Sequence, residues 1–213
     1  MFYRHIGKRC LDLLLTAPAV MILSPVLLVV AALVRLTLGS PVLFSMERPG
    51  LNGKPFQVYK FRTMRHAVDE HGQQLPDDQR LTFFGRALRD LSLDELPGLY
   101  HVLKGEMSLV GPRPLRMEFL EWYTPNQMHR HDVLPGISGW AQINGRNSIG
   151  WEQKLELDVW YVEHLSLWLD VKIIILTIPK VLCRKNVAYP ENATLTDFLR
   201  NRIHVDVEQG QKR

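Results

Sequence analysis

The residues of this sequence with the clearest chemical potential are two adjacent carboxylates, Asp94 and Glu95. Neighbouring positions of a helix point about 100° apart, so the two groups are expected to serve different partners. One carboxylate could attack phosphorus as a nucleophile while the other holds a metal ion. Magnesium is the ion we expect, because it prefers oxygen ligands and needs only one or two protein carboxylates beside phosphate oxygens.

A simpler interpretation of the same residues is the start of a helix, because Ser92 and Glu95 have the spacing of a capping box. The surrounding segments favour the chemical interpretation. They are rich in cations, several of them beside glycine or proline: Lys60, Arg62, Arg86, Arg89, Arg113 and Arg146. Guanidinium groups bind phosphate oxygens in pairs, so this set suits a diphosphate ligand.

Four other polar residues give weaker signals. His129 and His131 flank an arginine without a third ligand, a pattern more typical of a solvated surface than of a metal site. Asp158 and Asp170 bracket an amphipathic stretch that is rich in aromatic residues. We expect these two acids first to cap helices that face the membrane interface, and the alternative is that they support the residues of the active site.

An apolar run at residues 11–34 is long enough to cross a membrane as a straight helix. Two features instead favour a helix that enters the membrane and returns to the same side. Pro25 interrupts the run, and Ser24 can bond a carbonyl that the proline leaves free. Basic residues stand at both ends, and such residues prefer the cytoplasmic side. We therefore expect residues 1–38 to form a re-entrant membrane helix with both termini cytoplasmic.

Two alternatives remain for this segment: an ordinary spanning helix with a tolerated proline, and a signal peptide. The run is longer than the apolar part of a usual signal peptide, so we expect it to be retained. Near its start, Asp12 is expected to pair with Lys8 or Arg9 on the same helical face.

The remainder is expected to form a cytosolic catalytic domain over residues 39–200, with a polar C-terminal tail at 201–213. Residues 42–45 and 56–61 predict a short β-hairpin. Helical periodicity at 81–91, 96–103 and 116–123 follows, after a polar loop at 66–80. The expected fold class is therefore α+β, mainly helical, in a monotopic membrane protein.

Two further apolar segments, 151–169 and 171–183, suggest interfacial amphipathic helices that lie in the headgroup plane. Helices packed in the domain core are an equally good interpretation. The segment at 171–183 does not predict a second spanning helix, because it contains a proline and is too short.

Composition narrows the function classes only slightly. The 26 Lys and Arg against 22 Asp and Glu give a net charge of +4, which is compatible with anionic lipids, nucleotides or nucleic acid. No base-reading motif accompanies that charge, so we expect no nucleic-acid partner. Cys10 and Cys183 have no metal-ligand spacing, which indicates a reduced, cytosol-facing domain.

Over almost its whole length the sequence resembles the bacterial monotopic phosphoglycosyl transferases, the initiating sugar transferases of glycoconjugate assembly. The matching blocks are Lys8-Arg9 with Asp12, Ser24-Pro25, Arg48-Pro49-Gly50, KFRTM at 60–64, SLDELP at 92–97, GEMSLVGPRP at 105–114 and PGISGWAQINGR at 135–146.

The resemblance implies a reaction. A UDP-sugar would donate a phosphosugar to polyprenyl (undecaprenyl) phosphate and release UMP, at the cytoplasmic face of the bacterial inner membrane. The chain resembles the small form of the family, similar to the enzyme that starts bacterial N-linked glycan assembly. Diacetylbacillosamine is accordingly the first expectation for the sugar, with N-acetylhexosamine and galactose open, as are the oligomeric state and the pathway.

The resemblance also implies roles for individual residues. Asp94 matches the nucleophile that forms the covalent phosphosugar intermediate, and Glu95 matches the magnesium ligand. Arg113 matches a contact of the donor's phosphate. Ser24 and Pro25 match the re-entrant break. Phosphate or nucleotide contact is a looser assignment for four further cations: Lys60, Arg62, Arg89 and Arg146.

Two competing functions stay open on the residues alone. A membrane-bound, magnesium-dependent diphosphate hydrolase would use the same acids with water as acceptor. A non-catalytic, membrane-anchored binder of nucleic acid or anionic lipid would account for the positive charge but would have no need of the acidic pair.

Overall fold

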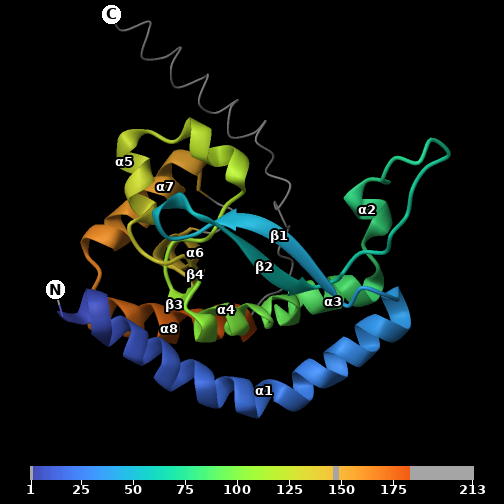
Figure 1. The fold of residues 1–213 in the computed structure, drawn as a ribbon, viewed down its shortest axis with the longest axis horizontal. Coiled ribbons are helices and arrows are strands. Elements are labelled where there is room, and N and C mark those ends of the chain that lie inside the picture. Colours follow the sequence, from blue (N-terminus) through green and yellow to red (C-terminus); the bar gives the residue numbers. More distant parts are fainter. Residues whose placement is uncertain (1, 146–148, 183–213) are drawn as a thin grey trace, which may run out of the picture.

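The computed structural model describes residues 2–145 and 149–182, which are mainly helical and carry two small sheets (Figure 1). A π-helical turn at Tyr3–Gly7 leads into the long helix α1 (Lys8–Leu38). The expected α+β, mainly helical class is confirmed. The elements after α1 are β1 (Leu43–Pro49), β2 (Pro55–Phe61), α2 (Asp77–Arg80), α3 (Phe83–Asp90), α4 (Gly98–Lys104), β3 (Ser108–Val110), α5 (Pro125–Met128), β4 (Gly136–Ser138), α6 (Trp140–Asn144), α7 (Trp151–Glu163) and α8 (Leu167–Leu182), with short 3-10 turns at Leu51–Gly53, Leu93–Glu95, Met117–Trp122 and His129–His131.

Helix α1 runs through Pro18 and Pro25 without interruption, yet it is bent, so that both of its ends approach the domain and its middle lies away from it (Figure 1). Pro25 has no N–H to donate to the carbonyl of Met21, four residues earlier. The Ser24 hydroxyl donates to that carbonyl instead, at 2.8 Å. The expected compensation of the proline by Ser24 is confirmed.

The second arm of α1 packs on the domain through an apolar cluster. Val30 and Val34 are buried against Phe61, at the end of β2, and Leu88 of α3. Burial of such side chains contributes about 1.5–3 kcal/mol each, so this cluster stabilises the contact between the arm and the domain.

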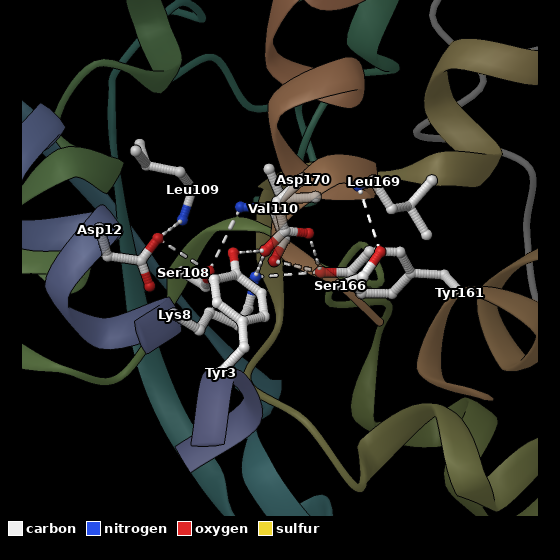
Figure 2. Close-up of polar contacts among 10 residues, drawn as sticks. All are labelled: Tyr3, Lys8, Asp12, Ser108, Leu109, Val110, Tyr161, Ser166, Leu169 and Asp170. Atoms are coloured by element: carbon white, nitrogen blue, oxygen red, sulfur yellow. Dashed lines mark hydrogen bonds and ion pairs between the residues drawn. The ribbon is translucent and has the colours of Figure 1, made fainter. Parts of the chain in front are cut away.

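The first arm is fastened by a buried polar network, called here the anchor network: Tyr3, Lys8, Tyr161 and Asp170 (Figure 2). The Lys8 ammonium lies 2.6 Å from one carboxylate oxygen of Asp170 and donates to the Tyr161 hydroxyl at 3.0 Å. Tyr3 and Tyr161 donate to Asp170 at 2.5 and 2.6 Å. The Asp170 side chain is 0% exposed. The network therefore joins the N-terminal arm to buried side chains of α7 (Tyr161) and α8 (Asp170).

The expected pairing of Asp12 with Lys8 or Arg9 is wrong. Asp12 is buried and accepts hydrogen bonds from the Ser108 hydroxyl at 3.0 Å and the Leu109 N–H at 2.9 Å (Figure 2). Arg9 donates to backbone carbonyls at the end of α4. The reason is tertiary: strand β3 and helix α4 present buried polar backbone to α1, and these groups need partners.

Between its two arms α1 exposes a broad apolar surface. Leu14, Met21, Ile22 and Leu28 are each at least 70% exposed. Among the described residues, Tyr3–Leu38 is the one helical segment long and apolar enough to cross a membrane. Both ends of α1 are tied to one domain, so this apolar surface lies around the bend of the helix.

One of the two sheets was predicted from the sequence and the other was not. The hairpin is confirmed, with β1 and β2 paired antiparallel from Leu43 opposite Phe61 to Pro49 opposite Pro55. The parallel pair of β3 and β4 was not expected. Its close approach requires glycine, because a Cβ at Gly136 would lie 2.0 Å from the backbone nitrogen of Gly111.

The two C-terminal segments divide between the two interpretations left open. Helix α7 belongs to the core, where Leu155 and Tyr161 are fully buried. Helix α8 lies beside the first arm of α1 (Figure 1) and exposes Trp168, Ile175 and Ile178. The exposed apolar side chains of α8 thus fit an interfacial helix, and α7 does not.

The remaining expectations hold in outline. Helices α3 and α4 fall within or close to the predicted segments, and the third predicted helix is a 3-10 turn at Met117–Trp122. The polar segment at 66–80 projects from the domain and contains the short helix α2 (Figure 1). The predicted tail at 201–213 lies outside the described residues.

Candidate active site

Asp94 and Glu95 lie in the wall of a cavity of about 560 Å³. The cavity is bounded by β2, the 3-10 turn Leu93–Glu95, the loop around Arg113, helix α7 and Leu23 at the bend of α1. The predicted carboxylates therefore share one space with side chains from the membrane helix and from the domain core.

The turn that carries the acids is positioned by α1. Leu93 packs on the cluster formed by Val30 and Val34 of the second arm. Ser92 has a left-handed backbone, with φ of 55°, and its side chain caps no helix, so the capping-box interpretation is wrong. The turn places Asp94 in the interior, 8% exposed, and Glu95 beside two cations.

Glu95 is the centre of an ion cluster. Lys60 Nζ lies 3.0 Å and Arg113 Nη2 lies 2.8 Å from the same carboxylate oxygen, Oε1. Burial favours the neutral acid, but Arg113 and Lys60 outweigh it and hold the pKa of the Glu95 carboxyl well below its usual range. Glu95 is therefore ionised at neutral pH and available as an oxygen ligand.

The other predicted phosphate-binding residues are placed differently. Arg89 lines the cavity and donates to the Thr63 hydroxyl at 2.9 Å. Arg62 does not line it. Its guanidinium donates to the Ser40 carbonyl at 2.9 Å and to that of Leu38, where it satisfies the C-terminus of α1. Arg146 lies outside the described residues.

A second, fully buried ion pair supports the Arg113 loop and was missed from the sequence. Arg130 donates to Asp158 at 2.7 Å and to the backbone carbonyl of Arg113 at 2.6 Å. The helix-capping expectation for Asp158 is wrong, since this acid lies in the middle of α7. It is also wrong for Asp170, whose carboxylate belongs to the anchor network.

Of the two histidines singled out in the sequence, one is exposed as expected and the other is buried. His131 is buried rather than solvated, and burial, aided by the charge of Arg130, lowers its pKa from 6.5 to about 4. His129 is exposed beside Asp132, as expected. His101, not singled out before, is fully buried and accepts a hydrogen bond from the backbone N–H of Tyr59, which fixes the strand position next to Lys60.

Among the described residues no three His, Cys, Asp or Glu side chains gather as ligands for a metal ion. A magnesium ion that is held largely by substrate phosphates needs fewer protein ligands. Glu95 suits that role, because it is ionised, lines the cavity and meets both of its cations at one oxygen. The residues present thus fit an ion that arrives with a diphosphate.

The chain is similar in sequence to several known proteins. A family model described as bacterial sugar transferase matches residues 3–184. The chain is 53% identical over 191 residues to an uncharacterized sugar transferase, EpsL, of Bacillus subtilis. The aligned residues make up 90% of this chain and 95% of that protein. Two larger relatives are UDP-N-acetylgalactosamine-undecaprenyl-phosphate N-acetylgalactosaminephosphotransferase of Aeromonas hydrophila and UDP-glucose:undecaprenyl-phosphate glucose-1-phosphate transferase of Escherichia coli, 40% and 41% identical over 82% and 84% of this chain. The chain spans 43% and 40% of their lengths.

Proposed function

The chain belongs to the bacterial sugar transferase family, and on that premise we propose that it transfers a sugar phosphate from a UDP-sugar to undecaprenyl phosphate and releases UMP. The observation that carries this proposal is the cavity itself. It combines a buried carboxylate, Asp94, with the ionised Glu95 and the cations Lys60, Arg89 and Arg113.

The proposed chemistry has two steps, and Asp94 takes part in both. In the first, a carboxylate oxygen of Asp94 attacks the sugar-bearing phosphorus, an O–P bond forms, and the bond to the bridging oxygen breaks so that UMP leaves. In the second, an oxygen of the lipid phosphate attacks the same phosphorus and Asp94 is released as a carboxylate. Arg113 and Lys60, which line the same cavity and contact Glu95, would stabilise negative charge on the phosphates.

Magnesium is part of the proposal as a cofactor that neutralises phosphate charge when bound. Glu95 would hold it. Lys60 and Arg113, which both contact Glu95, would then keep that carboxylate oriented toward the cavity.

The acceptor is proposed to reach the site from the membrane side. Leu23, at the bend of α1, lines the same cavity as Asp94. A bend immersed in the bilayer would therefore place the cavity next to the lipid headgroups, with the domain on the cytoplasmic side of the bacterial inner membrane.

Cysteine labelling tests this topology. A cysteine at the exposed position Phe2, introduced after Cys10 and Cys183 are replaced by serine, is expected to be shielded from a membrane-impermeant thiol reagent in intact cells and labelled after permeabilisation. A cysteine at the exposed loop residue Glu70 is the matched control and should behave identically. Labelling of residue 2 but not residue 70 in intact cells would show that α1 spans the membrane.

A panel assay tests the reaction and identifies the sugar. Purified protein in detergent is incubated with magnesium, undecaprenyl phosphate and UDP-sugars that carry diacetylbacillosamine, N-acetylglucosamine, N-acetylgalactosamine, glucose or galactose. At least one donor is expected to give UMP together with a lipid-linked sugar phosphate. Repeated turnover without the lipid would instead support the competing diphosphate hydrolase. The names of the relatives include N-acetylgalactosamine and glucose, so the panel needs both.

A further inference from the structure

One face of α7 forms a wall of the cavity. Trp151, Lys154, Leu155 and Asp158 all line it, at positions i, i+3, i+4 and i+7 of the helix. Leu155 is fully buried and packs against Phe119 and Tyr123, so this wall is part of the domain core. Lys154 is the cation that the wall presents, and the chemistry described above does not use it.

Lys154 differs from Lys60 and Arg113 in having no anionic partner. Within residues 2–145 and 149–182, no carboxylate lies within ion-pair distance of its ammonium. Asp158, one helical turn further on, forms an ion pair with Arg130, with Nη2 of the arginine 2.7 Å from Oδ2 of the acid. The Lys154 ammonium instead lies over the ring of Trp151, 4.8 Å from the centroid. Partial burial without a counter-charge lowers the pKa of Lys154.

A half-buried cation in a cavity gains most from an anionic ligand, because a phosphate restores the charge balance that burial removed. Two phosphates are available to this site, that of the donor and that of the lipid. Helix α7 meets the first arm of α1 near its C-terminal end, where Tyr161 accepts a hydrogen bond from Lys8, whereas it begins on the side of the domain away from α1 (Figure 1), and Lys154 lies near that beginning. A lipid phosphate would enter beside the bend of α1, so the wall that carries Lys154 faces the soluble donor.

On the basis of the proposed function, we propose that Lys154 binds the diphosphate of the nucleotide-sugar donor from the wall opposite the membrane helix. Trp151 supports the lysine stem, and its own ring packs on Phe119 at 5.3 Å between centroids. The diphosphate would then be held from two sides, by Arg113 and Lys60 near Glu95 and by Lys154 on α7.

Equilibrium binding of UMP and of the UDP-sugar found in the panel assay tests this role without any turnover. Lys154→Met keeps the length of the stem and its contact with Trp151 but removes the charge. We expect its dissociation constants for both nucleotides to rise about 10- to 100-fold, the usual effect of losing one hydrogen bond to a charged group. Lys154→Arg should restore binding to within a few fold, and the KM for undecaprenyl phosphate should stay unchanged.

The chain offers a matched control. Lys172 on α8 also lies over a tryptophan ring, that of Trp140 at 5.4 Å, but it is exposed and does not line the cavity. Lys172→Met should bind both nucleotides like the wild type. Unchanged nucleotide binding by Lys154→Met, or a rise confined to the KM for the lipid, would overturn the assignment. Absence of turnover by the wild type with every donor would count against the proposed function alone, since the comparison of UMP binding does not depend on turnover.

Discussion

Asp94→Asn is expected to abolish phosphosugar transfer, with a loss of roughly 10⁴-fold or more, as is typical when a catalytic nucleophile is removed. The amide is isosteric with the carboxyl group but is not a nucleophile toward phosphorus. Asp94 is 8% exposed, and Asn fills the same volume, so the variant should remain folded. UMP release measures the activity, and intact-protein mass measures the covalent step: without lipid, the wild type should gain one sugar phosphate and Asp94→Asn should gain none.

Asp132→Asn is the matched control for this experiment. It makes the same chemical change at an exposed aspartate that pairs with His129 and does not line the cavity. Its UMP release should equal that of the wild type. Thermal unfolding in detergent checks that Asp94→Asn is folded. Wild-type rates of UMP release by folded Asp94→Asn would rule out the proposed nucleophile.

Local patterns predicted the parts of the structure that depend on neighbours in sequence. The proline in α1 and its serine partner are adjacent, so the bond from Ser24 to Met21 followed from helix geometry. The hairpin likewise follows from two short apolar segments around a turn of glycine and proline. The placement of Glu95 beside cations was suggested by the blocks of residues around it rather than by any one spacing.

Pairs distant in sequence could not be predicted, because nothing local distinguishes them. Lys8 and Asp170 are 162 residues apart, and Asp12, one helical turn after Lys8, has the spacing of a nearer partner. Arg130 and Asp158 sit on separate elements and meet only in the folded domain. The guanidinium group of Arg62 suggested a phosphate ligand, but in the fold it lies next to the backbone carbonyls at the end of α1 and donates to them.

Helix α1 is part of the candidate site and more than a membrane anchor. Its second arm packs on Leu93, next to Asp94, and its bend contributes Leu23 to the cavity. A change in how the first arm is held would alter the angle of the bend and therefore the position of this wall. The anchor network consequently connects the stability of α1 with the geometry around the acids.

Lys8→Met is expected to destabilise the protein by about 3–5 kcal/mol, because it leaves the fully buried carboxylate of Asp170 without its cation. Guanidinium unfolding in mild detergent measures the loss. Arg4→Met is the matched control, since Arg4 is a cation of the same arm that makes an exposed contact with a backbone carbonyl, at 3.4 Å. Its effect should stay within about 0.5 kcal/mol.

The double variant Lys8→Met/Asp170→Asn separates charge from packing. The amide that replaces the Asp170 carboxylate still accepts a hydrogen bond from one of the two tyrosines through its oxygen and can donate to the hydroxyl of the other through its nitrogen. No unpaired charge remains in the interior, so a large part of the lost stability should return. If the double variant is instead as unstable as the sum of the two single variants, the ion pair does not fasten the arm and the apolar contacts of α1 must do so. Recovery of stability without recovery of UMP release would show, in addition, that the ion pair sets the angle of α1 on which the cavity depends.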